Sequence, residues 1–131
     1  MSSCFNETDD NLVDKLDLFD IGKQLNGYWI LTKTIKDGQS EHNSNTDELE
    51  HFEFDGIKGI RSYLTDNHDG TFSISSFISI CRLKDHDDKK FLEFTSMFDN
   101  WELEIVKITK GELILADSTK TWIYKSFQKE E

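Results

Sequence analysis

Gly27-Tyr28-Trp29-Ile30-Leu31-Thr32-Lys33-Thr34-Ile35 is the stretch that decides the fold. It is rich in aromatic and β-branched residues, it is entered through a glycine, and it is followed by Asp37-Gly38. This composition, with turn residues at both ends, predicts a β-strand. Gly27 removes a side chain where another segment can pass close, and Trp29 can close the end of a barrel with its large apolar surface. The simpler alternative is a glycine before an ordinary core tryptophan.

Length and charge restrict the class of protein. A chain of 131 residues has room for one domain with a real core. It contains no apolar run long enough to span a membrane, and its first residues lack the features of a signal peptide, so we expect a soluble, cytoplasmic protein. The net charge of −11 opposes binding to nucleic acids and to anionic lipids. We expect an acidic, monomeric protein.

The two cysteines do not form a disulfide framework, because one lies in a polar segment and the other in an apolar strand. Cys81 has the setting of a small buried hydrophobic residue. Cys4 has two interpretations. Ser2-Ser3-Cys4, followed by a polar and acidic segment, resembles the cleavage junction of bacterial lipoproteins, so Cys4 would anchor a cell-envelope protein whose signal peptide had been removed. The alternative is an ordinary disordered N-terminus.

A short helix is expected between the N-terminal segment and the first strand. Leu12, Leu16 and Phe19 recur at spacings that place them on one face, with Asp10 or Asn11 as the cap and Gly22 as the end. The helix would lie across one mouth of the sheet. We therefore divide the chain into residues 1–10, a disordered segment or lipoprotein tether, and residues 11–131, the β-barrel domain.

Eight strands are predicted from Gly27 onward. They span about residues 27–35, 47–54, 57–64, 71–83, 90–98, 101–108, 112–117 and 120–128. Asp55-Gly56, Asp69-Gly70 and Asp99-Asn100 are compatible with tight hairpins between them. The polar segment from Lys36 to Thr46 is the longest connection, which makes it the best candidate for a lid at the barrel mouth.

Alternation of residue types predicts that the strands are half buried. Trp101, Leu103 and Ile105 alternate with Glu102 and Glu104, for example. Such strands, close in sequence and joined by hairpins, indicate an antiparallel meander. The fold class is therefore all-β: an antiparallel eight-stranded meander barrel with a short N-terminal helix. The absence of proline also favours a closed sheet, and a sandwich of two sheets is the alternative.

A barrel of this size either packs its interior solid or leaves room for one ligand. The residues expected to point into the interior, and to contact such a ligand, are Phe52, Phe54, Phe72, Ile74, Phe94, Leu103 and Trp122.

The order of these elements resembles that of the small bacterial lipocalin-like domains, which belong to the calycins. The resemblance is carried by Gly27-Tyr28-Trp29 on the first strand and by Thr121-Trp122-Ile123-Tyr124-Lys125-Ser126-Phe127 on the last. It implies that Gly27, Trp29 and Lys125 close the barrel, with Trp29 packed beneath Lys125 in a cation–π contact worth about 0.5–2 kcal/mol. Fatty-acid-binding proteins share the Gly-x-Trp start, but they place two helices where this chain has the polar segment after Ile35.

No set of residues specifies a reaction or a metal site. His42, His51, His68 and His86 lack metal-ligand spacing. The segment from Asp66 to Gly70 resembles a calcium loop, but its glycine is out of place and the closing glutamate is missing. We predict no metal, no cofactor and no enzymatic activity.

Three functional classes follow. The first is a non-enzymatic binding module that holds a small hydrophobic or amphipathic molecule inside the barrel. The second is a structural or interaction protein whose interior is filled and which works through its surface. The third is an enzyme built on a calycin-like barrel. A cavity of roughly 300 Å³ or more would favour the first over the second.

Overall fold

The computed structural model describes residues 12–74 and 78–128, which form two short helices and ten strands. The helices are α2 (Leu12–Lys15) and α3 (Leu18–Leu25). The strands are β1 (Gly27–Lys36), β2 (Gln39–His42), β3 (Glu48–Asp55), β4 (Lys58–Asp66), β5 (Phe72–Ile74), β6 (Ser79–His86), β7 (Lys89–Thr95), β8 (Asn100–Ile108), β9 (Glu112–Ala116) and β10 (Lys120–Phe127). Among the described residues, no helix is long and apolar enough to cross a membrane.

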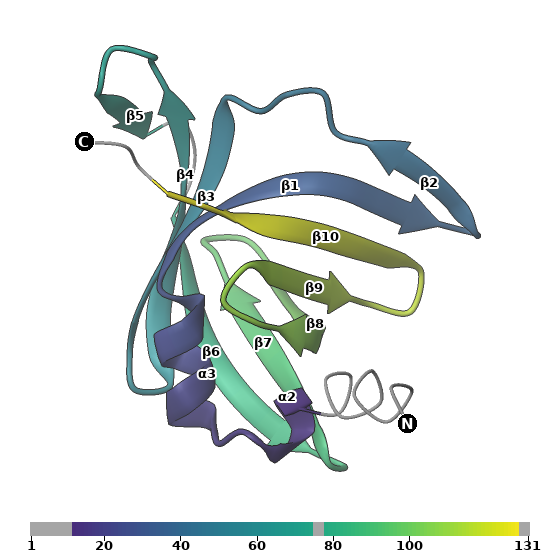
Figure 1. Ribbon diagram of the computed structural model, residues 1–131. Coiled ribbons are helices and arrows are strands. Elements are labelled where there is room, and N and C mark those ends of the chain that lie inside the picture. Colours follow the sequence, from purple (N-terminus) through teal and green to yellow (C-terminus); the bar gives the residue numbers. More distant parts are fainter. Residues whose placement is uncertain (1–11, 75–77, 129–131) are drawn as a thin grey trace, which may run out of the picture.

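Eight of the strands close into an antiparallel barrel (Figure 1). From β3 to β10 each barrel strand pairs with the next one along the chain, and β1 closes the ring by pairing with both β3 and β10. The pairing of β1 with β10 spans nearly their full lengths, from Tyr28 opposite Phe127 to Lys36 opposite Lys120. The predicted eight-stranded antiparallel barrel is confirmed, as is the adjacency of its first and last strands.

Two further strands lie outside the ring. β2 pairs only with the far end of β1, across a turn in which Asp37 and Gly38 both have positive φ. The segment expected to be a lid is therefore in part a hairpin that extends β1 away from the barrel (Figure 1). β5 pairs only with the end of β4, so the predicted strand 71–83 is two strands, β5 and β6.

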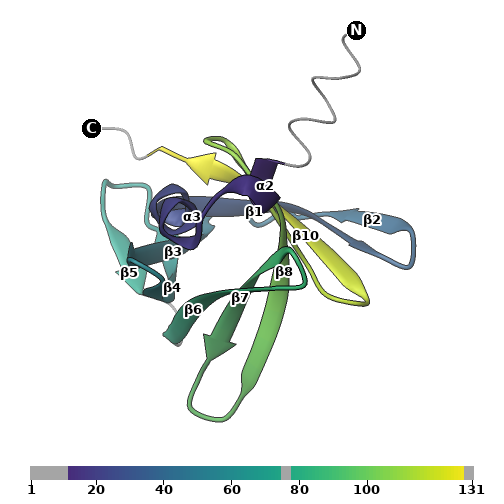
Figure 2. The ribbon, with the colours of Figure 1, turned by 90° about the horizontal axis from the view of Figure 1, so that it is seen from below.

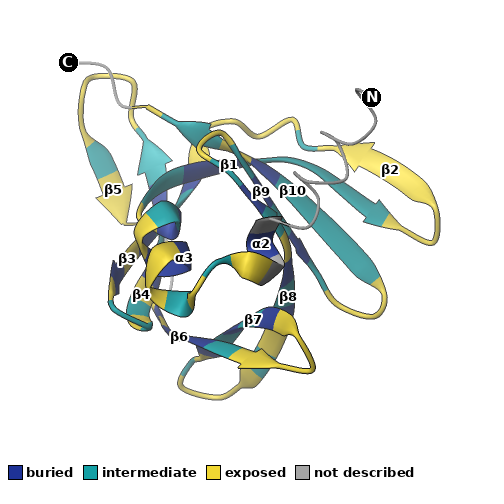
Figure 3. Ribbon diagram, turned by 60° about the horizontal axis from the view of Figure 1, so that its bottom comes forward, coloured by how far each residue is buried: buried dark blue, intermediate teal, exposed yellow. Residues whose placement is uncertain are grey.

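The helices cover one end of the barrel, as predicted. Figure 3 shows the strands as a ring with α2 and α3 over its opening, and Figure 2 shows the same end from below. Asp17 caps α3 by accepting a hydrogen bond from the Asp20 backbone N–H at 2.8 Å. Asp10 and Asn11, the caps predicted for a helix that begins near Leu12, lie outside the described residues. Gly22 does not end α3 but lies buried inside it, beside the β3–β4 turn.

The predicted role of Trp29 at the closed end of the barrel agrees with its position. Trp29 is buried, and its indole Nε1 donates to the Leu25 carbonyl oxygen in the last turn of α3 at 2.9 Å. This bond gives a partner to a carbonyl that the helix end leaves free. Gly27 is needed for its backbone conformation, with φ near +129°, because no atom lies within 4 Å of where its Cβ would be. The predicted close passage of another segment at Gly27 is wrong.

The predicted contact between Trp29 and Lys125 is not made. Trp29 lies opposite Ser126, whereas Lys125 lies opposite Ile30. Neighbouring residues of a strand point to opposite faces, so Trp29 faces the interior and Lys125, which is exposed, faces outward. The resemblance supplied the correct pair of strands, but the register differs by one residue.

The apolar residues form two clusters on opposite faces of the sheet. The larger cluster fills the end of the barrel under α3, where Phe52 and Phe94 are almost fully buried and their ring centroids lie 6.5 Å apart. The smaller cluster lies on the outer face and consists of Ile30, Leu49 and Leu64, with Tyr28, Phe72 and Phe127 packed against them.

Two residues expected inside the barrel are therefore outside it. Phe72 packs in the outer cluster, and Ile74, opposite Leu64 on the same face, is 69% exposed. The prediction failed because it assigned the apolar face of this segment to the interior. Ile78 and Ile80, in phase with Phe72 and Ile74, are also exposed, whereas Ser79 and Cys81 between and beside them are buried.

Candidate functional site

The interior of the barrel has an apolar half and a polar half. Phe52, Phe54, Phe94 and Leu103, all predicted to face inward, are buried in the larger cluster, and Trp122 packs against it half-buried. The four buried side chains occupy the helix-covered half, whereas Trp122 lies opposite Thr34, farther from α3 than Tyr124. The polar half begins one layer further from α3 and contains Glu50, Arg61, Tyr63 and Tyr124.

Register explains why these polar side chains meet. Glu50 precedes Phe52 by two residues on β3, so both point inward, and Arg61 and Tyr63 of β4 lie opposite Phe52 and Glu50. Tyr124 approaches from β10, and its hydroxyl group donates a hydrogen bond to the Glu50 carboxylate. The hairpin of β3 and β4 and the distant strand β10 thus bring four polar side chains together in the interior.

Arg61 is the central residue of this cluster. Its side chain is only 7% exposed, and its guanidinium carbon lies 4.2 Å from the ring centroid of Phe94, 4.8 Å from that of Tyr63 and 5.8 Å from that of Trp101. Cation–π contacts of this kind stabilise a charge that burial has removed from water. The aromatic rings therefore supply part of the solvation that Arg61 loses.

The hydrogen bonds of Arg61 are incomplete. Nη1 contacts Glu50 Oε1 at 3.4 Å, which is long for a bond between charged groups. Among the described residues, buried Nε has no hydrogen-bond partner at all. Buried guanidinium nitrogens are normally paired, so this edge of Arg61 is left with unused donor capacity.

Burial dominates the protonation of Glu50. Its side chain is 12% exposed, and loss of solvation raises the pKa of the carboxyl above its usual range, although Arg61 and the Tyr124 hydrogen bond act in the opposite direction. Burial and the Glu50 charge also raise the pKa of Tyr63 and, more strongly, that of Tyr124. Both tyrosines are therefore neutral hydrogen-bonding groups near neutral pH.

A cavity of about 580 Å³ lies beside Arg61 at the end of the barrel away from α3. Arg61, Tyr63, Ser79 and Trp101 line it together with Ile78, Ser96, Met97 and Phe98. We call this space the mouth cavity. Its volume lies within the range of small-molecule sites, and its walls are mostly apolar around one buried cation.

The rim of the mouth cavity is formed by exposed apolar side chains. Met97 and Phe98, in the turn between β7 and β8, are 86% and 91% exposed, and Ile78, just before β6, is 54% exposed. An apolar rim beside an apolar cavity provides a continuous surface along which the body of an amphipathic molecule can lie.

A second, smaller opening of about 100 Å³ reaches the cluster from the side of Glu50. It lies between β1 and β3, where Tyr63 separates it from the mouth cavity. Asn43 ties the segment before β3 to β1, because its side-chain amide donates to the Leu31 carbonyl oxygen at 2.7 Å. Glu50 is one of the residues that line this opening.

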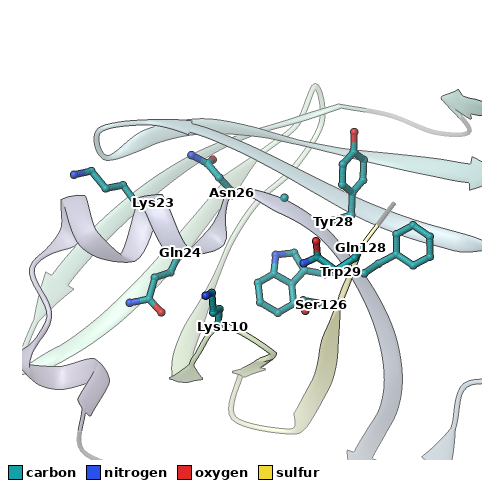
Figure 4. A pocket seen from close by; sticks show the side chains of 10 residues that line it. Lys23, Gln24, Asn26, Tyr28, Trp29, Lys110, Ser126 and Gln128 are labelled. Atoms are coloured by element: carbon teal, nitrogen blue, oxygen red, sulfur yellow. The ribbon is translucent and has the colours of Figure 1, made fainter. Parts of the chain in front are cut away.

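A larger hollow than the mouth cavity is a poorer candidate. It measures about 750 Å³ and lies outside the barrel, where Figure 4 shows Lys23 and Gln24 of α3 and Lys110 of the β8–β9 turn around it. Lys23 and Lys110 are exposed. This groove holds no buried charge with an unused donor, so nothing in it selects a ligand as the Arg61 cluster can.

Two other predicted features have plain structural roles. Cys81 is fully buried, and burial raises the pKa of its thiol to about 12, so it stays protonated. In the Asp66–Gly70 turn, the Asp66 carboxylate accepts a hydrogen bond from the His68 N–H, and His68 contacts Asp47 at 2.8 Å. Within the described ranges, no group of three His, Cys, Asp or Glu side chains could hold a metal ion. Cys4 and residues 1–10 lie outside the described residues.

Sequence reasoning missed Glu50, Arg61, Tyr63 and Trp101 as site residues. Arg61 is one of two arginines in the chain and lies on the same predicted strand as Tyr63. The hairpin between β3 and β4 was the available signal. Its turn, Asp55-Gly56, fixes a register in which Arg61 lies opposite Phe52, a residue predicted to face inward.

Comparison with known proteins supports the fold. Neither a protein-family model nor a curated protein matches the sequence. Among solved structures, a lipocalin-like protein from Bacteroides uniformis superposes with a TM-score of 0.51 at 14% identity, over 79% of this chain and 99% of that protein. An uncharacterized protein from Bacteroides eggerthii superposes with a TM-score of 0.52 at 11% identity, over the same shares of the two chains.

Likeness at these identities concerns architecture alone. It identifies no ligand and no activity. Together with the closed ring of eight antiparallel strands, the comparisons show that this chain has the lipocalin-like β-barrel fold that its first and last strands resemble.

Proposed function

We propose that this protein is a non-enzymatic binding module that holds one small amphipathic molecule in the mouth cavity. The observation that carries the proposal is a cavity of about 580 Å³ with mostly apolar walls, at the end of the barrel where β6 and β8 begin. Volumes of this size suit small-molecule sites. Phe52, Phe54 and Phe94 are buried in the core cluster under α3, so we place the ligand nearer the open end of the barrel than these predicted lining residues.

Tryptophan fluorescence provides the test. Trp101 lines the mouth cavity, whereas Trp29 is buried beneath α3. We would titrate a panel of fatty acids, sterols and apolar dyes, and we expect saturable changes in emission that disappear in Trp101→Phe. If no member of the panel binds, the binding proposal is wrong.

A matched pair of variants locates the site. Ser96→Trp places a large side chain in the wall of the mouth cavity, and Ser118→Trp places the same side chain in the exposed β9–β10 turn. A bulky residue that fills a binding cavity removes the space and contacts of the ligand. We expect Ser96→Trp to weaken binding at least tenfold, about 1.4 kcal/mol, and Ser118→Trp to leave it unchanged. Equal binding by the two variants would contradict this location.

A surface interaction function is the second candidate, and one observation favours it. Ile60 and Ile80 lie directly opposite each other on β4 and β6, and they are 45% and 63% exposed. Apolar neighbours on an outer sheet face are typical of contact surfaces. A mouth cavity that binds no member of the ligand panel would make this the leading function.

Location and assembly are part of the same proposal. We propose a soluble, cytoplasmic monomer, with a lipid-anchored envelope protein modified at Cys4 as the alternative. Intact mass of the protein isolated from its own cells distinguishes the two, because lipidation adds acyl chains to Cys4. Light scattering across a concentration series tests the monomer.

A further inference from the structure

We propose that Arg61 is the receptor for a carboxylate, so that the ligand of the mouth cavity is an apolar molecule with one terminal carboxylate group. This inference rests on the proposed function, and it names the chemistry of the ligand's head group. It also assigns the part of the cavity in which that group is held. The starting observation is that the buried Nε of Arg61 lacks a partner among the described residues.

The side chain is held in place before any ligand arrives. The rings of Phe94, Tyr63 and Trp101 surround the guanidinium at 4.2–5.8 Å from its central carbon. A buried arginine held between rings loses little further conformational freedom when it binds a ligand. Arg61 is thus pre-organised, and it lines the cavity.

The unused edge of the guanidinium has the geometry of a carboxylate receptor. Glu50 contacts Nη1 only, at 3.4 Å, so the Nε edge makes no ion pair. A planar carboxylate can accept two parallel hydrogen bonds from one edge of a guanidinium, and such bidentate pairs are stronger and more directional than single contacts. A ligand carboxylate would therefore complete the pairing that Glu50 leaves unfinished.

The surroundings select the rest of the ligand. Ser79 is the buried neutral polar residue of the cavity wall, and Ile78, Met97 and Phe98 lead outward from Arg61 to the rim. An anionic head at Arg61 places an attached apolar chain along these side chains. A ligand cation in the same place would instead lie close to the like charge of buried Arg61, and this repulsion would lower its affinity several-fold.

Glu50 provides a second property, which is coupling to protons. The titratable and charged groups that face it are Arg61 and Tyr63 of β4, Tyr124 of β10 and Glu48 of its own strand. Burial already favours its neutral form, and a ligand carboxylate that shares Arg61 adds a second negative charge nearby. We therefore expect Glu50 to take up a proton from solvent when the anion binds.

The experiment compares three ligands that share one alkyl chain: decanoate, decanol and decylammonium. Binding is measured by calorimetry and by tryptophan emission near neutral pH. A carboxylate that gains a bidentate pair with a buried guanidinium should bind at least about tenfold more tightly than the alcohol. Calorimetry in buffers of different ionisation enthalpy measures the proton taken up with decanoate.

A double variant serves as the control for folding. Arg61→Met alone would leave Glu50 buried without its partner, so the test uses Arg61→Met with Glu50→Gln, which removes both charges. Urea unfolding checks that this variant folds. We expect it to bind decanoate no more tightly than decanol. Glu50→Gln alone should bind decanoate more tightly than wild type and without proton uptake.

The outcomes separate this inference from the proposed function. If wild type binds decanol as tightly as decanoate, or if the double variant keeps the preference for decanoate, Arg61 is not the receptor and the binding module stands. If none of the three ligands binds wild type although a sterol or dye of the fluorescence panel does, the carboxylate inference is wrong and the binding module stands. If nothing in either set binds, both proposals are wrong.

Discussion

Replacing Gly22 with alanine should destabilise the protein, although alanine is the better helix former. In an unobstructed helix the change would stabilise by about 1 kcal/mol. Gly22 is buried in α3, however, and a Cβ there would lie 2.5 Å from the carbonyl oxygen of Gly56, with Leu83 and Phe54 atoms at 3.5 Å. The approach to Gly56 is much shorter than any normal contact, so either α3 or the β3–β4 turn must move.

The size of the effect depends on which part can yield. The obstacle is a backbone carbonyl in a turn where Gly56 has φ near +70°, and Asn26 ties the end of α3 to the backbone of Phe54 beside it. Overpacking typically costs about 1–3 kcal/mol, and a rigid backbone obstacle places this case in the upper part of that range. After the gain in helix propensity is subtracted, we expect a net loss of about 1–2 kcal/mol.

Urea unfolding followed by circular dichroism measures this difference. Lys23→Ala is the matched control, because Lys23 is exposed on the same helix and its replacement should change the free energy of unfolding by less than about 0.5 kcal/mol. An unchanged slope of the transition would show that only stability has changed. A Gly22→Ala protein more stable than wild type would refute the reasoning, because propensity would then outweigh the contact with Gly56.

Three further predictions concern buried polar groups. Trp29→Phe leaves the Leu25 carbonyl without its 2.9 Å partner, and we expect unfolding in urea to show a loss of about 1–3 kcal/mol. Glu50→Gln should remove a pH dependence of stability. Burial raises the folded-state pKa of Glu50 above 4.5, so wild type loses stability as the pH rises toward and through that pKa. The variant should show no such loss when urea unfolding is measured from about pH 4.5 to pH 8. In a Cys4→Ser background, Cys81, with a pKa of about 12 and no exposure, should not react with a thiol reagent at about pH 8 until the protein is unfolded, and rapid reaction of the folded protein would contradict its burial.

The barrel itself was predictable from local chemistry. Asp55-Gly56 and the other turn residues separate strands of clear alternation, and each such pair becomes a hairpin in the structure. Sequential hairpins with one wet face leave few architectures, and the bulky aromatic interior favours closure. The pairing of the first and last strands then follows from closure. Which side of the sheet Lys125 faces depends on the register between β1 and β10, and no turn sets that register because the two strands are far apart in the chain.

Several elements could not be read because their sequence pattern is ambiguous. β2 consists of Gln39–His42, which are all exposed, so it shows no apolar alternation and only the Asp37-Gly38 turn indicates it. Gly22 looks like a helix end, but it is a site of close approach that only tertiary packing reveals. Sequence patterns indicate turns well, but they do not show which segment of the folded chain packs closely against a glycine.

The candidate site was missed for a related reason. On β4, apolar Ile60 and Leu64 alternate with Arg61 and Tyr63, so a hydrophobic pattern assigns the isoleucine and leucine to the interior. The structure has the opposite phase: Ile60 is exposed, Leu64 joins the outer cluster, and Arg61 is buried. A charged residue in the interior departs from the rule that the apolar residues of an alternating strand face inward, and such exceptions concentrate at functional sites.

The position of β1 in the ring has a consequence for how the barrel forms. The strands from β3 to β10 pair in chain order, so each pairing closes only a short loop and can form early. β1 instead pairs with β10, almost a hundred residues away, and with β3 over only three residue pairs, Gly27–Trp29 with Glu50–Phe52. By this argument the late event in folding is the pairing of β1, which carries α3 bonded to Trp29, with β10 to close the ring. Until that step the facing edges of β1 and β10 are unpaired, and a second chain competes for them at high concentration.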